Sequence, residues 1–223
     1  MDSLERLRDD MIICRKCPRL VRWREKVAAE KRPAFRDWDY WGRPVPGFGD
    51  ADAELLVVGL APPAHGGNRT GRVFTGDRSG DWLYRALDRA GYANQPLSVR
   101  REDGLRLTGA YVCAAVRCAP PENKPTPDER DDCAPYLSRE MQLLQRVRVI
   151  VPLGAFAYEA VCRWSGLKPR PRFGHGVEAT LADGRAVICS YHPSQRNTFT
   201  STLTEDMFDA VFRRARELAP GER

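Results

Sequence analysis

The sequence predicts an α/β protein in which helices cover both faces of a mostly parallel sheet. Residues 54–60, 110–116 and 147–153 form continuous apolar runs, which are typical of strands buried on both faces. Helical patterns separate these runs, and that alternation favours a three-layer arrangement with a parallel sheet. The length of 223 residues fits a single domain, and the chain shows no internal repeat.

The N-terminal 53 residues precede the first predicted strand. Apolar residues from Leu4 to Ile12 have helical spacing, so we expect a first helix that ends near Cys14. A second, highly charged helix is expected over residues 20–31. Residues 32–53 are rich in proline, glycine and aromatic side chains, which predicts an irregular but packed loop.

A helix is expected after the strand at 54–60. It covers residues 79–90, with Ser79 as its N-cap and Gly91 at its end. The second strand, at 110–116, is followed by another helix. There Thr126 and Glu129 have the spacing of a capping box with a proline at the first helical position, so this helix is expected to run to about residue 146.

The C-terminal third completes the alternation. The third strand, at 147–153, leads into a helix over residues 155–164. Residues 177–182 and 185–191 predict a hairpin whose second arm is the fourth core strand. A last helix is expected over residues 204–218.

Composition and charge exclude several classes of protein. The apolar share of 42% and the charged share of 30% exclude a disordered chain and a fibrous repeat. No apolar run approaches the roughly 18 residues of a membrane helix, and the first residues do not resemble a signal peptide, so we expect a cytoplasmic protein. The 36 Lys and Arg exceed the 30 Asp and Glu, which is compatible with a polyanionic partner but also with arginine-rich genome composition.

Seven cysteines in a chain without a secretion signal argue against a disulfide framework. Three of them lie in apolar patterns and are expected to be core residues: Cys113, Cys162 and Cys189. The other four are candidate metal ligands: Cys14, Cys17, Cys118 and Cys133. Zinc sites commonly use two CxxC-like pairs, whereas the last two of these cysteines are fifteen positions apart, which favours a larger [4Fe–4S] cluster. Zinc and four unrelated free thiols are the alternatives.

Three unusual loops follow predicted strands, at the sheet edge where ligands bind in parallel α/β folds. The loop at 59–77 is rich in glycine and leads into a helix, so its backbone can approach an anion or a flat ring. The loop at 117–125 is stiffened by prolines. The third loop contains His192, which can polarise or protonate a substrate oxygen, or can be structural.

Together these residues resemble the iron–sulfur uracil-DNA glycosylases, and more narrowly family 5, or type b. The matching features follow one another along the chain: Cys14-x-x-Cys17, Gly59-Leu60-Ala61-Pro62, the run from Gly71 to Asp77, Cys118, Cys133 and His192-Pro193-Ser194. The resemblance covers residues 1 to about 215. It implies a glycosylase α/β/α sandwich on a four-stranded parallel sheet, as one domain over residues 1–223 in which the helical and irregular residues 1–53 contribute two cluster cysteines.

The resemblance also implies an activity. A glycosylase of this kind hydrolyses the N-glycosidic bond of a damaged base in double-stranded DNA, after the nucleotide has flipped into a pocket, and leaves an abasic site. Uracil, hydroxymethyluracil, hypoxanthine, xanthine and etheno-cytosine are the implied substrates. The [4Fe–4S] cluster is implied to be structural, and the enzyme is expected to be a monomer without a membrane partner.

Site roles follow from the same resemblance. His192 would stabilise the leaving base, Asn123 would present its amide to the base or to water, and Asp77 would steer water or balance positive charge. Asp77 can equally cap the helix that begins near Ser79. Leu60 stands where other glycosylase families carry a polar or acidic residue. The expected pocket residues are Gly59, Ala61, His65, Phe74 and Gly76. The expected DNA contacts are Arg69, Arg72, Ser194, Gln195, Arg196 and Asn197.

Two other classes fit part of this pattern. A zinc-bearing nucleic-acid-binding module without catalysis would keep the basic charge and the four thiolates but would leave His192 without a task. An iron–sulfur oxidoreductase or electron carrier would need a second cofactor site, for which the sequence contains no motif.

Overall fold

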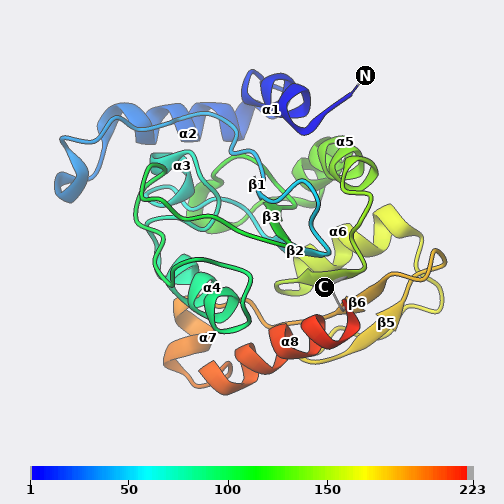
Figure 1. Ribbon diagram of the computed structural model, residues 1–223. Helices are drawn as coiled ribbons and strands as arrows, with labels where there is room; N and C mark the ends of the chain where they lie inside the picture. Colours follow the sequence, from blue (N-terminus) through cyan, green and yellow to red (C-terminus); the bar gives the residue numbers. More distant parts are fainter. Residues whose placement is uncertain (1, 220–223) are drawn as a thin grey trace.

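The computed structural model describes residues 2–219 as a six-stranded sheet between layers of helices (Figure 1). The strands are β1 (Phe48–Gly49), β2 (Leu55–Gly59), β3 (Ala110–Ala114), β4 (Val149–Pro152), β5 (Glu178–Thr180) and β6 (Ala186–Ile188). Their spatial order is β1-β3-β2-β4-β6-β5. The central strands β3, β2, β4 and β6 are parallel, as predicted, whereas β1 and β5 add antiparallel edges.

The helices agree with the predicted pattern in most places. They are α1 (Leu4–Ile12), α2 (Pro18–Glu30), α3 (Gly67–Thr70), α4 (Arg78–Arg89), α5 (Pro127–Leu143), α6 (Ala155–Ser165), α7 (Gln195–Phe199) and α8 (Glu205–Leu218). Short 3-10 helices occur at η1 (Pro33–Phe35) and η2 (Pro121–Asn123). Among residues 2–219, no helix combines the length and the apolar character that crossing a bilayer requires.

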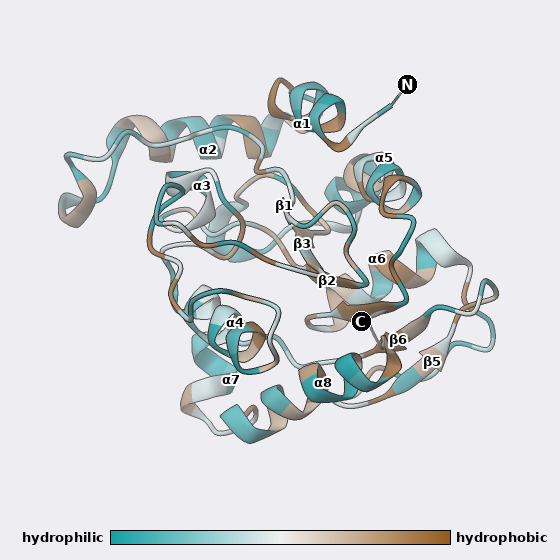
Figure 2. Ribbon diagram, in the orientation of Figure 1, coloured by the Kyte–Doolittle hydropathy of each residue, from teal (hydrophilic) through white to brown (hydrophobic). Residues whose placement is uncertain are grey.

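The sheet separates two apolar layers. Leu55 and Val57 of β2 pack in the cluster that contains residues of α4 and α8, whereas Leu56 and Val58 pack in the cluster with residues of α5 and α6. This alternation follows from the strand geometry, which points successive side chains to opposite faces. Figure 2 shows the resulting pattern, with apolar strands inside and mixed helices outside. Cys113, Cys162 and Cys189 are buried in the second cluster, which confirms them as core residues.

Three local predictions need correction. Helix α4 is capped by Asp77 and not by Ser79, because the Asp77 Oδ1 accepts a hydrogen bond of 3.1 Å from the Gly80 N–H. Helix α5 ends at Leu143, three residues before the predicted end. The segment after His192 forms α7 where a loop was expected, since Ser194 accepts a hydrogen bond from the Asn197 N–H and so caps a short helix.

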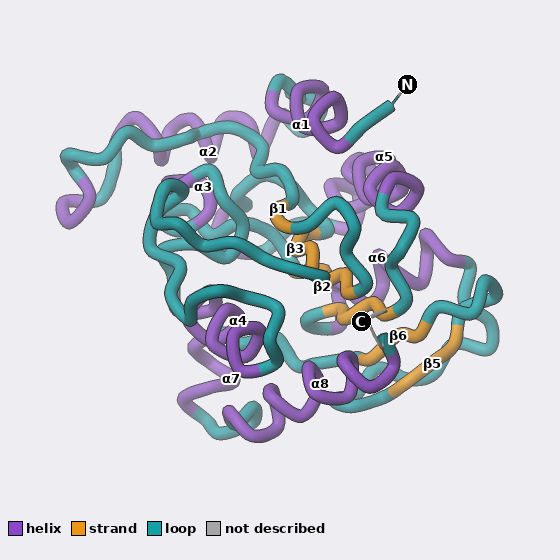
Figure 3. The backbone as a smooth tube through the Cα atoms, viewed as in Figure 1, coloured by secondary structure: helices purple, strands orange, loops and turns teal. Residues whose placement is uncertain are grey.

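The order of the strands brings the long loops together. After the short edge strand β1, the chain forms β2 in the middle of the sheet, crosses to β3 on one side and then reaches β4 on the other side of β2. In doubly wound sheets the crevice lies at such a reversal, beyond the carboxyl ends of the strands. Figure 3 shows how much of the chain around β2 and β3 is loop, including the segment at 60–77 in which α3 is embedded.

Candidate active site

One cavity of about 720 Å³ lies among the loops that follow β2, β3 and β6. Its volume is within the range of small-molecule sites. The cavity is lined by these residues that the sequence singled out: Ala61, His65, Phe74, Gly76, Asp77, Asn123, His192, Ser194, Gln195 and Arg196. Three loops that are distant along the chain therefore contribute to one site, as the sequence predicted.

Phe74 is held rigidly in the wall of this cavity. Its φ of 51° lies in the left-handed region, which is strained for a bulky residue. Two glycines make room for it: a Cβ on Gly59 would lie 2.6 Å from the Phe74 ring, and one on Gly80 would lie 1.9 Å from the Phe74 carbonyl oxygen. Gly59 therefore supports the site from beneath the aromatic ring and is not among the residues that line the cavity.

His192 lies beside this ring. The two ring centroids are 6.0 Å apart with an interplanar angle of 29°. The backbone carbonyl of His192 accepts hydrogen bonds from the Asn197 side-chain amide at 2.9 Å and from the Ser194 N–H at 2.8 Å. Burial lowers the pKa of His192 to about 4, so the imidazole is neutral near pH 7.

Asp77 caps helix α4 and also lines the cavity. One carboxyl oxygen caps α4, while Oδ2 is buried and, among the described residues, has no hydrogen-bond partner. Burial raises the pKa of Asp77 to about 6, although the Gly80 and Ser79 N–H groups oppose this shift. The carboxyl is thus mostly ionised at pH 7 and protonated below pH 5.

His65 and Asn123 lie on the walls of the same cavity. The Nδ1 of His65 shares a hydrogen bond of 3.0 Å with the Tyr40 hydroxyl. Burial lowers the pKa of His65, and the charges of Arg32 and Arg69 lower it further. Asn123 ends η2 with a φ of 56° and is exposed, so its amide is free to meet a ligand.

Two predicted phosphate contacts do not fit the structure. Arg69 is 3% exposed and donates to backbone carbonyls of its own loop. Arg72 is 4% exposed, and its guanidinium pairs with Asp103 at 2.7 Å and donates to Thr75 Oγ1 at 2.9 Å. Burial and internal partners leave neither guanidinium available to a phosphate, so both predictions were wrong.

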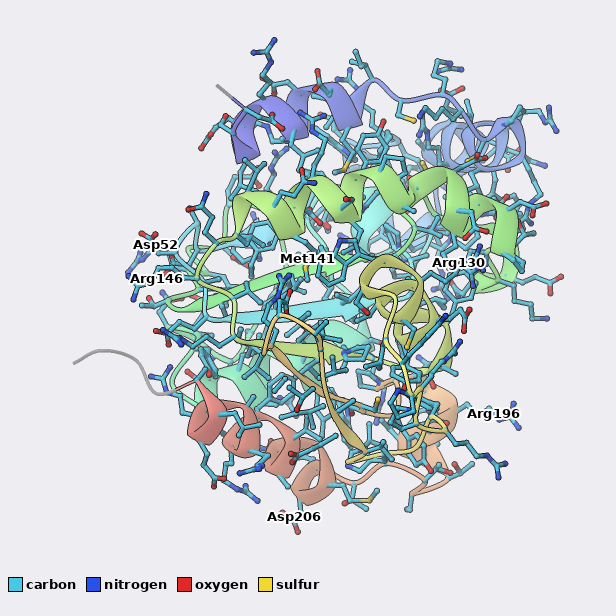
Figure 4. The ribbon with its side chains drawn as sticks, turned by 90° about the vertical axis from the view of Figure 1, so that its right-hand side faces the viewer. Asp52, Arg130, Met141, Arg146, Arg196 and Asp206 are labelled. Carbon is cyan, nitrogen blue, oxygen red and sulfur yellow. The ribbon has the colours of Figure 1, made fainter. Side chains whose placement is uncertain are left out.

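The segment after His192 contains the other four predicted DNA contacts, and they differ in exposure. Gln195 and Arg196 are exposed at the start of α7, and Figure 4 shows Arg196 extending outward. Ser194 caps α7 and lines the cavity, whereas Asn197 is bonded internally to the His192 carbonyl and does not line it. Gln195 and Arg196 are therefore accessible at the rim of the cavity, whereas Asn197 supports the loop.

The four candidate ligand cysteines line one small cavity between α2, α5 and the loop after β3. Within residues 2–219, no three Cys, His, Asp or Glu side chains are arranged around a single-ion site. A [4Fe–4S] cluster needs a wider arrangement of ligands than a single ion does, because each thiolate binds a separate iron atom. Arg24 is 2% exposed and donates a hydrogen bond of 2.8 Å to Cys118 Sγ, so a buried positive charge lies beside these thiols. Burial raises the pKa of Cys118 to about 11, whereas the Arg24 charge and hydrogen bond act in the opposite direction and favour its thiolate form.

Comparison with known proteins identifies the fold. Residues 46–216 match the family model of the uracil DNA glycosylase superfamily. The chain belongs to this superfamily. A type-5 uracil-DNA glycosylase of Mycobacterium leprae is 53% identical over 220 residues, which cover 97% of this chain and 96% of the relative. Type-5 enzymes of Thermus thermophilus (53% over 207 residues; 92% and 94%) and Mycobacterium bovis (56% over 210 residues; 93% and 78%) are also similar.

These relatives confirm the family-5 resemblance and the glycosylase fold. The superfamily match includes every cavity residue that the sequence predicted, but it begins after Cys14 and Cys17. Sequence reasoning missed Arg32, Phe35 and Arg78, which also line the cavity of this glycosylase fold. The first two lie in the segment expected only to pack. That segment also contains Trp38, Tyr40 and Trp41, and the gathering of aromatic rings close to Arg32 was the available signal.

Proposed function

We propose that this protein removes uracil from double-stranded DNA by hydrolysing its N-glycosidic bond, leaving an abasic site. The names of the type-5 relatives support this reaction. The observation that carries it is the meeting of Asp77, His192 and Phe74 at one cavity of about 720 Å³. That space accepts a nucleobase flipped out of the duplex, and flipping is required because the bond is inaccessible in stacked DNA.

His192 acts on the leaving base. Breaking the bond leaves negative charge on the base, and an N–H donor aimed at a base carbonyl stabilises that charge. A neutral imidazole can donate through one nitrogen, and the low pKa of about 4 keeps His192 neutral. One preorganised donor of this kind contributes about 3–4 kcal/mol to the stability of a transition state.

Asp77 acts on the sugar side of the bond. The deoxyribose becomes positively charged as the base leaves, and an ionised carboxylate balances that charge or orients the attacking water. The free Oδ2 of Asp77 supports this role, because a buried carboxylate oxygen without a protein partner needs another group to bond.

Phe74 and Asn123 bind the base. The fixed ring of Phe74 supplies a stacking surface, for which the strained backbone at this residue is preorganised. Asn123 presents an amide that donates to carbonyl oxygens and accepts from ring N–H groups. We also propose hypoxanthine, xanthine, hydroxymethyluracil and etheno-cytosine as further substrates, because the resemblance to family 5 implies them.

DNA approaches from the side of α7. Gln195 and Arg196 are exposed there, and Arg78 lines the same cavity. We assign phosphate contact to these two arginines and not to Arg69 or Arg72. The formal net charge of +6 favours association with a polyanion and makes it sensitive to salt.

The thiol cavity holds a [4Fe–4S] cluster with a structural role. Its ligands would be Cys14, Cys17, Cys118 and Cys133, and Arg24 would donate a hydrogen bond to one of their sulfurs. Residues about 100 positions apart along the chain become linked when such a cluster binds, which stabilises the fold by closing a long loop.

The deciding experiment uses duplex DNA with a single U·G pair, or a single hypoxanthine, followed by alkali. Strand scission at the lesion is expected, and its absence at both lesions would contradict the proposed reaction. Iron, sulfide and zinc contents of the purified protein separate the cluster from the zinc alternative. Four irons and absorbance near 400 nm are expected, whereas one zinc in a colourless protein would favour a binding module.

A further inference from the structure

Arg69 has an unusual place in the loop between β2 and α4. It belongs to α3 and is 3% exposed, although a buried arginine needs partners to offset its lost hydration. Its Nε donates to the His65 carbonyl oxygen at 2.7 Å, and its Nη2 donates to the Gly76 carbonyl oxygen at 3.1 Å. One guanidinium thus links two points of the loop that are eleven residues apart.

Aromatic rings fix the guanidinium from outside the loop. Its carbon lies 3.9 Å from the ring centroid of Phe35 and 4.0 Å from that of Trp38. Cation–π contacts at these distances stabilise a buried cation and restrict its orientation. Phe35 also lines the cavity, so the same contact connects Arg69 to the wall of the proposed active site.

The link at Gly76 acts directly on the next residue, Asp77. Gly76 has a φ of +72°, and a Cβ there would lie 2.3 Å from the Arg69 Nη2. A Cβ on Gly66 would lie 2.3 Å from the Asp77 Oδ2, so the carboxyl packs against the other side of the same loop. Both ends of the loop therefore contact Arg69, at His65 and at Gly76, and in this conformation Asp77 lies at the cavity.

Asn68 Oδ1, Arg69 Nη1 and Asp77 Oδ2 are buried in this loop and have no hydrogen-bond partner among the described residues. The last two belong to groups that carry charge. Their opposite charges attract each other, since the two residues interact electrostatically. We propose that Arg69 is a positioning residue for base excision, which holds the Asp77 carboxylate at the cavity and supplies the positive charge that balances it. This inference rests on the proposed function of Asp77.

The pH dependence that follows has a definite sign. Burial raises the pKa of Asp77 to about 6, and the Arg69 charge lowers it. Other groups also surround Asp77: Arg78, Asp81 and Tyr84 on α4, and His65 and His192 across the cavity. Asp81 acts against Arg69, because its negative charge raises the pKa of Asp77. Loss of the Arg69 charge therefore moves the ionisation of Asp77 to higher pH.

The test compares Arg69→Gln and Arg69→Lys in the full chain with its metal centre. Single-turnover cleavage of a U·G duplex is measured from pH 5 to 9. For Arg69→Gln we expect the midpoint of the acidic limb of the rate profile to move to higher pH, because the Arg69 charge lowers the pKa of Asp77. For Arg69→Lys we expect an unchanged midpoint but a rate lowered roughly tenfold, because one ammonium cannot hold both carbonyls in the same geometry. Arg85→Gln removes an exposed arginine of α4 and is the control.

A double-mutant cycle with Asp77→Asn separates this role from a general structural one. If Arg69 acts through Asp77, Arg69→Gln should lower the rate far less in the Asp77→Asn background than in the wild type. Full effects in both backgrounds, an unshifted pH midpoint in a folded Arg69→Gln variant, or a fully active Arg69→Lys variant would each overturn the inference. An Asp77→Asn variant with wild-type activity would instead overturn the proposed role of Asp77.

Discussion

Replacing Asp77 by Asn should make the protein more stable while it makes the enzyme less active. Burial raises the pKa of this carboxyl from 3.8 to about 6. The folded state therefore holds a proton that the unfolded state has released between these values, and stability falls as pH rises through this window. The raised pKa of Asp77 lowers the free energy of unfolding by about 3 kcal/mol at pH 7.5 and by about half of this at pH 5.

Asn removes the charge but preserves the local structure. Its side-chain oxygen can accept the Gly80 N–H as Asp77 does, and Asn is as effective an N-cap as Asp. We therefore expect the free energy of unfolding of Asp77→Asn to exceed that of the wild type by up to about 3 kcal/mol at pH 7.5, and by less at pH 5. Cleavage of a U·G duplex should fall by roughly 100-fold or more, because a neutral amide cannot balance the charge on the sugar.

Urea unfolding at the two pH values measures the stability, with the slope against urea checked for equality between variants. Asp52→Asn is the matched control, because this carboxyl is exposed and its removal should change stability little at either pH. A variant that is less stable than the wild type at pH 7.5, or a difference that does not depend on pH, would refute the idea that Asp77 is a buried charge kept for function.

Further predictions concern the ring, the histidine and the thiol cavity. His192→Ala should lower single-turnover cleavage by roughly 100- to 1,000-fold, with DNA binding by gel shift nearly unchanged. Gly59→Ala should displace the Phe74 ring, since the new Cβ would lie 2.6 Å from it, and should weaken uracil cleavage more than thermal stability. The absorbance of the Arg24→Gln variant near 400 nm should decay faster in air than that of Arg22→Gln. Arg22 is exposed on the same helix and serves as the control. Equal rates of decay would contradict a role of Arg24 at the thiols.

The fold was predictable because its signals are local. The apolar runs of β2, β3 and β4 have no alternation, and such runs occupy central parallel strands whatever the rest of the chain does. The edge strand β1 was not predictable, because it has only two residues and exists through its pairing with β3. The cap of α4 was misplaced by two residues, since Asp77 and Ser79 are both good caps and only the three-dimensional turn decides between them.

The site shows where reading residue types along a chain reaches its limit. The side chains of Asp77, His192 and Phe74 are of kinds that take part in base excision, and all three line one cavity. For Arg69 and Arg72, by contrast, the sequence indicates only that a positive charge is present. What that charge does depends on partners such as Asp103 for Arg72, and Phe35 and Trp38 for Arg69, about thirty residues away along the chain.

Exposed arginines in a DNA-binding enzyme and buried arginines that hold a catalytic loop are therefore indistinguishable in sequence. The structure distinguishes the two kinds of arginine by how far each is buried. We expect their substitutions to differ in the same way. Loss of Arg196 should weaken DNA binding in a salt-dependent way, because it is exposed beside the cavity. Loss of Arg69 should leave that salt dependence intact and change the rate instead, because its charge is directed at the Gly76–Asp77 turn and not at the nucleic acid.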